Sequence, residues 1–146
     1  MTQIKQKIDA VVKNLKAVPE FSKVRFVREY TDKFTETPIS GFLAAVCVKS
    51  TELCETYLGG LIMPRKKGKM YRAVAEIRVY APKNQNGSGL SELVGEMMYR
   101  LEDADEENII TGAKAGAIEF DENVSAVFRR LTFTVEFFEG GEEQNG

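Results

Sequence analysis

Histidine is absent from the sequence, and cysteine is scarce. Without histidine the chain lacks the commonest general base and metal ligand, which excludes Ser-His and Cys-His arrangements of catalytic residues. Cys47 and Cys54 are the only cysteines, and their spacing matches neither a zinc site nor a redox motif. We therefore expect two reduced thiols rather than a disulfide, and neither a cofactor nor a metal.

Carboxylates are the remaining candidates for acid-base chemistry. They occur in an acidic run over residues 102–107 and at Asp121 and Glu122. Both groups fall at an expected helix end or turn, where acidic residues are ordinary, and the run lacks the ligand spacing of a calcium loop. The sequence therefore favours a protein that is not an enzyme, with a histidine-free enzyme as the least favoured alternative.

Long apolar runs and a large net charge are also missing. The chain of 146 residues is 43% apolar and carries a formal net charge of −2. That charge is too small to attract nucleic acid or a membrane by bulk electrostatics, and no stretch fits a membrane span or a secretory signal. We predict one α+β domain over residues 1–138, followed by a flexible acidic tail over residues 139–146.

Charge is unevenly distributed along this chain. The first predicted helix is rich in lysine, a basic loop lies near the middle of the sequence, and an acidic run follows the second predicted helix. The residues are Arg65, Lys66, Lys67 and Lys69 in the basic loop, and Glu102, Asp103, Asp105, Glu106 and Glu107 in the acidic run. Opposite patches on one small domain favour association with further copies or charged partners. A solvated surface that maintains solubility is the alternative.

The basic loop also has a second interpretation. Tyr71 and Arg72 follow it, and cations next to an aromatic residue are typical of nucleic-acid contacts. A hairpin tip whose lysines protect a sheet from edge pairing would have the same composition. The sequence leaves both interpretations open.

Two stretches have apolar residues at helical spacing. The first runs from Ile4 to Leu15, with lysines opposite, and ends before Pro19. The second runs from Leu90 to Leu101 as an unbroken apolar stripe, and Ser88 is well placed to cap it. Both stretches predict amphipathic helices.

Several stretches predict strands. Apolar residues alternate over 22–30 and 70–81, run almost continuously over 42–49, and form a weaker pattern over 109–120. Residues 51–63 fit either a short helix or an irregular strand, and residues 64–69 are expected to be a hairpin tip or a long loop.

The longest predicted strand covers residues 125–138 and follows a turn at residues 121–123. One side is apolar and belongs in the core, whereas the other side should meet water or a partner. The apolar side consists of Leu131, Phe133, Val135 and Phe137, and the other side includes Thr132, Thr134 and Glu136. Tyr80, Phe128 and Phe138 are expected to be exposed or covered by a neighbouring copy.

The order of these elements predicts an α+β domain. Two helices with single apolar stripes need a sheet face on which to bury them. We therefore expect a mainly antiparallel β-sheet with two amphipathic helices packed on one face.

The chain resembles the tail terminator (tail completion) proteins of long-tailed bacteriophages and of phage-tail-like bacteriocins. The resemblance lies in pattern over most of the chain. It rests on the stretches IKQKIDAVVKNL, GFLAAVCV, YLGG, MYRAVAEIRVYAP, GLSELVGEMMYRL and AIEFDENVSAVFRRLTFTVEFF. None of these stretches is a signature motif, so no functional residue is transferred.

The resemblance implies a structural role in a virion or tail-like particle that assembles in the cytoplasm of the bacterial host. Proteins of this family form a hexameric ring that caps the head-proximal end of the tail tube and joins it to a connector or collar. It implies further copies of the chain and the tube protein as partners, with the sheath, the connector and DNA in the lumen as additional candidates, and no membrane.

In a ring of this kind, Arg65, Lys66, Lys67 and Lys69 would face an acidic partner or the DNA passage, and Arg129 and Arg130 would contact a subunit or the tube. Two alternatives remain: another head-tail connector or tail-completion component, and a small nucleic-acid-binding α+β module.

Overall fold

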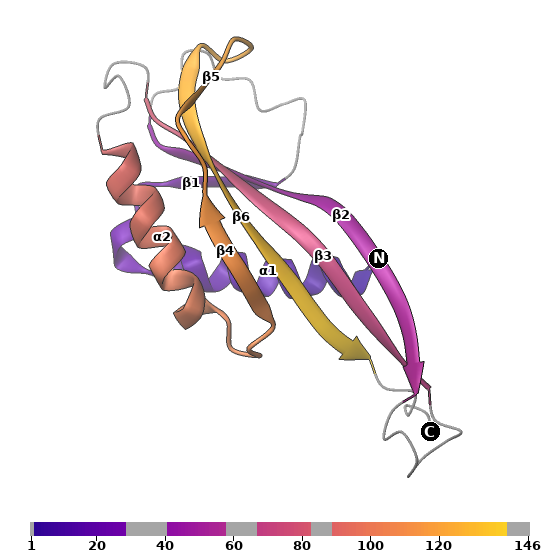
Figure 1. The fold of residues 1–146 in the computed structure, drawn as a ribbon. Helices are drawn as coiled ribbons and strands as arrows, with labels where there is room; N and C mark the ends of the chain where they lie inside the picture. The colour runs from indigo at the N-terminus through magenta and orange to yellow at the C-terminus, as the bar shows by residue number, and fades with distance from the viewer. Residues whose placement is uncertain (1, 29–40, 58–66, 83–88, 140–146) are drawn as a thin grey trace.

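The structure is a computed structural model that describes residues 2–28, 41–57, 67–82 and 89–139. The described residues form one six-stranded sheet and two α-helices (Figure 1). The elements are α1 (Thr2–Lys16), the 3-10 helix η1 (Pro19–Phe21), β1 (Arg25–Arg28), β2 (Leu43–Tyr57), β3 (Lys67–Tyr80), α2 (Leu90–Ala104), β4 (Ile110–Ala115), β5 (Glu119–Asp121) and β6 (Ala126–Glu139).

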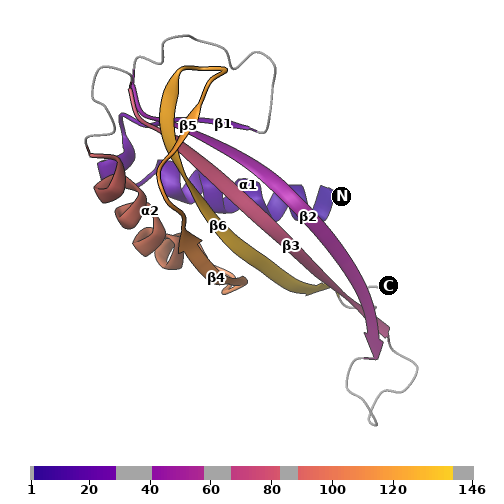
Figure 2. The same cartoon turned by 45° about the horizontal axis from the view of Figure 1, so that its top comes forward.

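The strands are ordered β1-β2-β3-β6-β4 across the sheet, and β5 also pairs with β6. Only the β1–β2 pair is parallel, and every other pair is antiparallel. The predicted α+β fold with a mainly antiparallel sheet is therefore confirmed. The long strands β2, β3 and β6 form its centre (Figure 2).

The main core lies between this sheet and the two helices. Buried side chains from α1 and α2 form one cluster with buried side chains from β2, β3 and β6. Along β3 these are the alternate residues Ala73, Ala75, Ile77 and Val79, so both helices bury their apolar stripes against the same face of the strand. We call this the helical face and the opposite side the open face.

The predicted alternation of core-facing and outward-facing side chains along β6 is confirmed. Leu131, Phe133 and Val135 are almost completely buried, and Phe137 continues the same row in the main core. Their neighbours Thr132, Thr134 and Glu136 are partly exposed on the open face. The period-two pattern was sufficient here because one face of the strand meets the helices and the other does not.

Residues 51–63, for which the sequence left two interpretations, form a strand as far as Tyr57. Residues 58–66 lie outside the described part of the chain. A register shift between Val48 and Ser50 places Lys49 in a β-bulge. The bulge reverses which residues of β2 face the open side, so a single alternation could not describe the whole strand.

Three other predictions need correction. The single strand expected over residues 109–120 is two strands, β4 and β5, separated around Gly116, a residue that weakens strands. Tyr80 and Phe128 are buried within the chain, because a second, smaller cluster with Val124 covers them on the open face. Their rings lie 5.0 Å apart. Phe138, in contrast, is exposed as expected.

Both helices form where predicted, but the start of α2 differs in detail. The N-cap position is Gly89, with a φ of 83° and no side-chain capping bond, whereas Ser88 lies outside the described residues. β6 includes Glu139, which the prediction assigned to the tail, and the rest of the predicted tail, residues 140–146, lies outside the described residues.

Candidate assembly surface

The open face of the sheet carries a row of charged side chains from neighbouring strands. Antiparallel pairing places these residues opposite one another on the surface. They are Lys49 and Glu52 from β2, Arg72, Glu76 and Arg78 from β3, Glu119 from β5, and Arg130 and Glu136 from β6.

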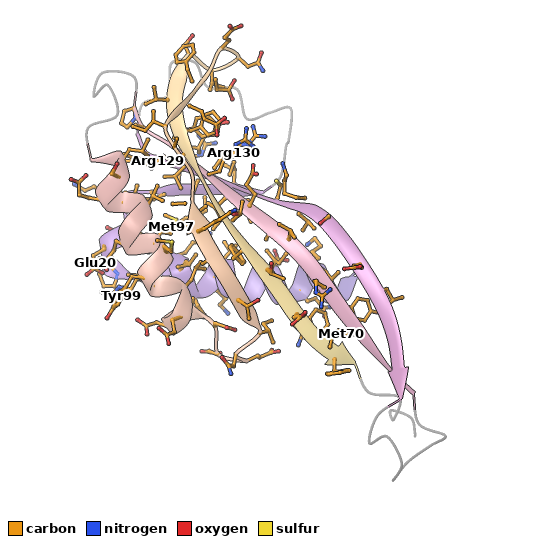
Figure 3. All side chains as sticks on the ribbon, in the orientation of Figure 1. Glu20, Met70, Met97, Tyr99, Arg129 and Arg130 are labelled. Atoms are coloured by element: carbon orange, nitrogen blue, oxygen red, sulfur yellow. The ribbon has the colours of Figure 1, made fainter. Side chains whose placement is uncertain are left out.

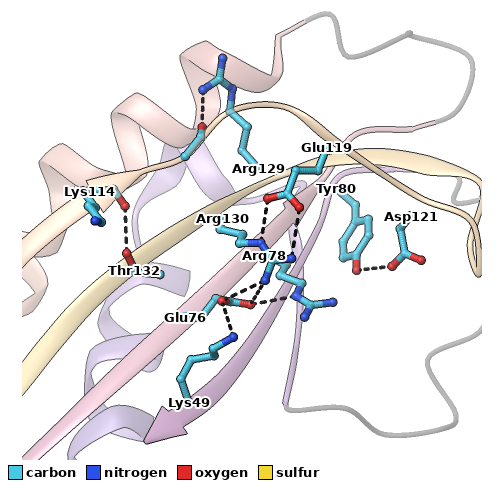
Figure 4. A network of polar contacts seen from close by, with 11 residues as sticks. Lys49, Glu76, Arg78, Tyr80, Lys114, Glu119, Asp121, Arg129, Arg130 and Thr132 are labelled. Atoms are coloured by element: carbon cyan, nitrogen blue, oxygen red, sulfur yellow. Dashed lines mark hydrogen bonds and ion pairs between the residues drawn. The ribbon is translucent and has the colours of Figure 1, made fainter.

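Glu76 is the centre of this row and is only 1% exposed. Three cations surround its carboxylate: Arg78 Nε at 2.8 Å, Arg130 Nη1 at 3.3 Å and Lys49 Nζ at 3.4 Å (Figure 4). The bulge in β2 brings Lys49 to this position. A buried carboxylate of this kind is retained only when cations and hydrogen bonds compensate for its lost hydration.

The ionisation of Glu76 follows from these contacts. Burial acts to raise the pKa of the carboxyl, but the hydrogen bond from Arg78 and the charges of Lys49 and Arg130 outweigh it and hold the pKa below its ordinary value. Glu76 is therefore ionised at neutral pH. Its oxygens are fully engaged in ion pairs, which makes it a structural anion rather than a proton donor.

Arg130 links this centre to β5. Its guanidinium binds both carboxylate oxygens of Glu119, with Nε at 2.7 Å and Nη2 at 3.1 Å. The hydrogen bond from Arg130 lowers the pKa of Glu119, and its pairing with Glu119 raises the pKa of Arg130. This bidentate geometry fixes the orientation of both side chains and holds β5 against β6.

Tyr80 and Asp121 close one end of the row. The Tyr80 hydroxyl donates to Asp121 Oδ2 at 2.8 Å, and the same carboxylate accepts from the Asn123 amide in the β5–β6 turn. Burial, supported by Asp121 and opposed by Arg78, raises the pKa of Tyr80 to about 12. The hydroxyl is therefore neutral at physiological pH and ties β3 to the turn.

At the other end of the row, Arg72 pairs with β6 and β2. Its Nη2 lies 2.6 Å from Glu136 and its Nη1 lies 3.3 Å from Glu52. These three side chains are partly or largely exposed, so the pairs add little to stability. They order the surface and leave its charges accessible to a partner.

Arg129 and Arg130, which were predicted to share a contact, lie on opposite faces of β6. Arg130 belongs to the Glu76 network on the open face, whereas Arg129 points to the opposite side and donates from Nη1 to the Gly116 carbonyl at 2.6 Å (Figure 3). Arg129 Nε is buried without a hydrogen-bond partner. The two arginines therefore do not form one contact site, because neighbouring residues of a strand face opposite ways.

The basic loop is described only in part. Arg65 and Lys66 lie outside the described residues. Lys67 and Lys69 are part of β3, where their backbone lies opposite Tyr57 and Glu55 of β2. The positions of their side chains are not described. Three residues of the acidic run have contacts within the chain. Glu107 pairs with Lys7 of α1 at 2.5 Å, Asp103 pairs with Arg100 at 3.5 Å, and Asp105 accepts hydrogen bonds from the amides of Ile109 and Ile110.

Large apolar side chains are exposed at two ends of the sheet. Leu53 on β2 and Phe138 on β6 are each 52% exposed. Ile118 and Phe120, around the start of β5, are 49% and 61% exposed. These exposed apolar side chains are available to contact another protein.

Sequence reasoning missed the Glu76 network and the exposed pair Ile118 and Phe120. A signal for the first was present: Glu76 lies between Ala75 and Ile77 in an otherwise apolar stretch, with Arg72 and Arg78 on the same side of the strand. No comparable signal marked Ile118, because its exposure depends on where the chain breaks between β4 and β5.

The described surface consists of paired charges and a few exposed apolar side chains. Within residues 2–28, 41–57, 67–82 and 89–139, no group of three or more cysteine or acidic side chains is arranged to hold a metal ion. No helix in the described ranges has the length and apolar character needed to cross a membrane. The ordered charges of the open face and the apolar ends of the sheet can bind another protein surface.

Comparison with known proteins adds no assignment to these observations. No protein-family model matches the chain, and no curated protein matches it either.

Proposed function

We propose that this protein is a structural subunit of a phage tail or tail-like particle. In this role it forms a ring, with six copies as the expected number, that caps the head-proximal end of the tail tube. The ring stops tube polymerisation and provides the joining surface for the connector or collar. The pattern resemblance to tail terminator proteins suggests the role, and the geometry of the sheet supports it.

The observation that carries the proposal is the projecting part of the sheet. At one end of the sheet, β2 and β3 project past the helices and the last residues of β6 run beside them (Figures 1 and 2). We define residues 50–57, 67–74 and 134–139 as the blade, of which Ala73, Val135 and Phe137 still belong to the main core. Leu53 lies on the helical face of this blade and Phe138 on its open face. An exposed apolar residue on each face of the blade is compatible with a protein partner on either side. A closed ring on a tube supplies such partners.

Charge supports the same role. The open face of the blade carries Glu52, Arg72 and Glu136 in mutual ion pairs. A surface of paired, accessible charges provides specificity of orientation more than affinity. A ring subunit requires this property, since each copy must meet its neighbour in one orientation.

The test combines mass with tube capping. The mass of the purified chain is measured by light scattering alone and after addition of tail tubes grown from the tube protein of the same particle. We expect a ring, alone or on the tubes, and tubes that stop elongating. Leu53→Ser should weaken capping, whereas the control Tyr99→Ser, which changes an exposed residue of α2, should leave it intact.

Two results would contradict the proposal. One is a chain that stays monomeric with tubes present and leaves their elongation unchanged. The other is salt-dependent binding of DNA or RNA by that monomer, which would favour a nucleic-acid-binding module instead.

A further inference from the structure

The sheet has two borders that the described residues leave unpaired. On one border, β4 pairs only with β6, and every residue from Thr111 to Ile118 is exposed. On the other border, β1 pairs with β2 only as far as Val46, and residues 49–53 of β2 are exposed. Exposed borders of this kind attract additional strands.

The β4 border has few features that would prevent such pairing. Between Thr111 and Ile118, Lys114 is its only charged residue. A bulge with Gly112 at a φ of 64° interrupts the start of β4, so the regular part begins at Lys114. The Gly116 amide donates to the Arg130 carbonyl of β6 at 2.8 Å. Because amides alternate along a strand, the Ala115 amide points away from β6 and toward the border.

The β2 border offers matching groups. The Arg25 amide of β1 donates to the carbonyl of Phe42, just before β2. Backbone groups alternate along a strand, so those of Phe42 and of every second residue after it point away from β3 and toward this border. The bulge at Lys49 shifts this alternation by one residue. After it, the backbone groups of Thr51 and Leu53 are the ones that point toward the border. β2 and β4 run in opposite directions, because each of the three steps from β2 through β3 and β6 to β4 is antiparallel.

The two borders also differ in charge. A groove of about 270 Å³ on the β1 side lies between α1 and β1, and its charged lining residues are Asp9, Lys13 and Lys16. A groove of about 270 Å³ on the β4 side lies between α2 and β4, and its charged lining residues are Glu102 and Asp105. The charged residues that line the first groove therefore carry a net positive charge, and those that line the second a net negative charge.

From these observations we infer that the β4 border of one copy adds to the β2 border of the next, so that a single sheet continues from copy to copy. The occupant of each border is a second copy of this chain. When each copy has the same orientation as the one before it, the new pair of strands is antiparallel. The groove with a net positive charge on one copy then lies toward the groove with a net negative charge on its neighbour. A contact between two different patches is heterologous, and it closes into a ring when the rotation is right. This inference rests on the proposed ring.

The first test removes one outward amide. Ala115→Pro deletes the donor on the β4 border, where proline is tolerated because that amide points away from β6 and has no partner strand among the described residues. Ala115→Ser keeps the amide and serves as the matched control. We expect Ala115→Pro to raise the concentration for half-assembly at least about tenfold, as the loss of one or two interface hydrogen bonds implies. Ala115→Ser should assemble as the natural chain does, and circular dichroism should show the same fold for both.

The second test identifies the partner border. Ala115→Cys and Thr51→Cys are prepared separately in a Cys54→Ser background, with Cys47 left in place because it is buried. A short bismaleimide should join the two variants when they are mixed and should join neither variant to itself. A chain with both substitutions should give a ladder of covalent products that ends at the size of the ring.

The outcomes separate this inference from the proposed function. Self-joining of Ala115→Cys into dimers would show a two-fold β4–β4 contact and overturn the inference. Rings that form normally with Ala115→Pro, or that give no joined product, would also overturn it and leave the ring proposal standing. A chain that stays monomeric even on tail tubes would overturn both.

Discussion

Replacing Glu76 by glutamine tests whether the buried carboxylate organises the open face. The change keeps the size of the side chain but removes the charge that three cations share. Removing one partner of a buried ion pair costs about 3–5 kcal/mol. The cost here should be smaller, because the side chains of Lys49, Arg78 and Arg130 are 42%, 24% and 32% exposed and recover hydration. Arg130 also retains Glu119.

We therefore expect Glu76→Gln to lower the free energy of unfolding by about 2 kcal/mol at neutral pH. The measurement is urea unfolding followed by far-ultraviolet circular dichroism, where this loss lowers the midpoint by about 1 M. The matched control is Glu52→Gln, which changes an exposed carboxylate 3.3 Å from Arg72 on the same face and should leave the midpoint unchanged.

The pH dependence of the free energy of unfolding gives a second test, in which the natural chain is compared with Glu76→Gln. The pKa of Glu76 is lower in the folded chain than the ordinary value of about 4.3. Its contribution is therefore present above that ordinary value and is lost as the pH falls through the folded-state pKa. The difference between the natural chain and Glu76→Gln should vanish in acid. Equal losses for Glu76→Gln and Glu52→Gln, or a difference that persists in acid, would refute the reasoning.

Three further changes test other parts of the fold. Tyr80→Phe should cost about 1 kcal/mol in thermal unfolding because it removes the bond to Asp121. It should also abolish the late step, near pH 12, in a tyrosinate absorbance titration. Since that pKa lies above the ordinary value of about 10, the stability from Tyr80 should decline between these two values. Met97→Ala should cost about 2–5 kcal/mol in urea unfolding because it leaves a cavity in the main core, and the partly exposed Met98→Ala should cost less. Gly89→Ala should cost about 1–2 kcal/mol because alanine is strained at a φ of 83°, with Phe42 Cζ at an ordinary contact distance of 3.6 Å from the new methyl. A melting temperature equal to that of the natural chain would contradict this last prediction.

The positions of the helices and of most strands could be predicted because periodicity is a local property. The stripe from Leu90 to Leu101 shows which side of α2 is buried, whatever that side meets. The row from Leu131 to Phe137 likewise shows which side of β6 faces the core. An α+β class follows, since two amphipathic helices require a sheet on which to pack.

The hairpin of β5 and β6 could be predicted from the turn at residues 121–123, but the pairing of the other strands could not, because it joins residues far apart in the chain. The parallel β1–β2 pair, the position of β3 between β2 and β6, and the division of residues 109–120 into β4 and β5 all depend on such pairing. The candidate surface depends on it too. Glu76 is a buried anion only because β2, β3 and β6 bring Lys49, Arg78 and Arg130 to one point.

The sequence by itself therefore determined the local elements, the core side of each and the class of fold, because these depend on spacing along the chain. It also carried the pattern that suggests a tail protein. Only the tertiary structure decided that Arg129 and Arg130 face opposite ways in different surroundings and that Tyr80 and Phe128 are covered within the chain. It also decided that the borders of β2 and β4 have no further partner strand among the described residues. Each of these depends on which distant segments share a face or a border, and spacing along the chain does not encode that.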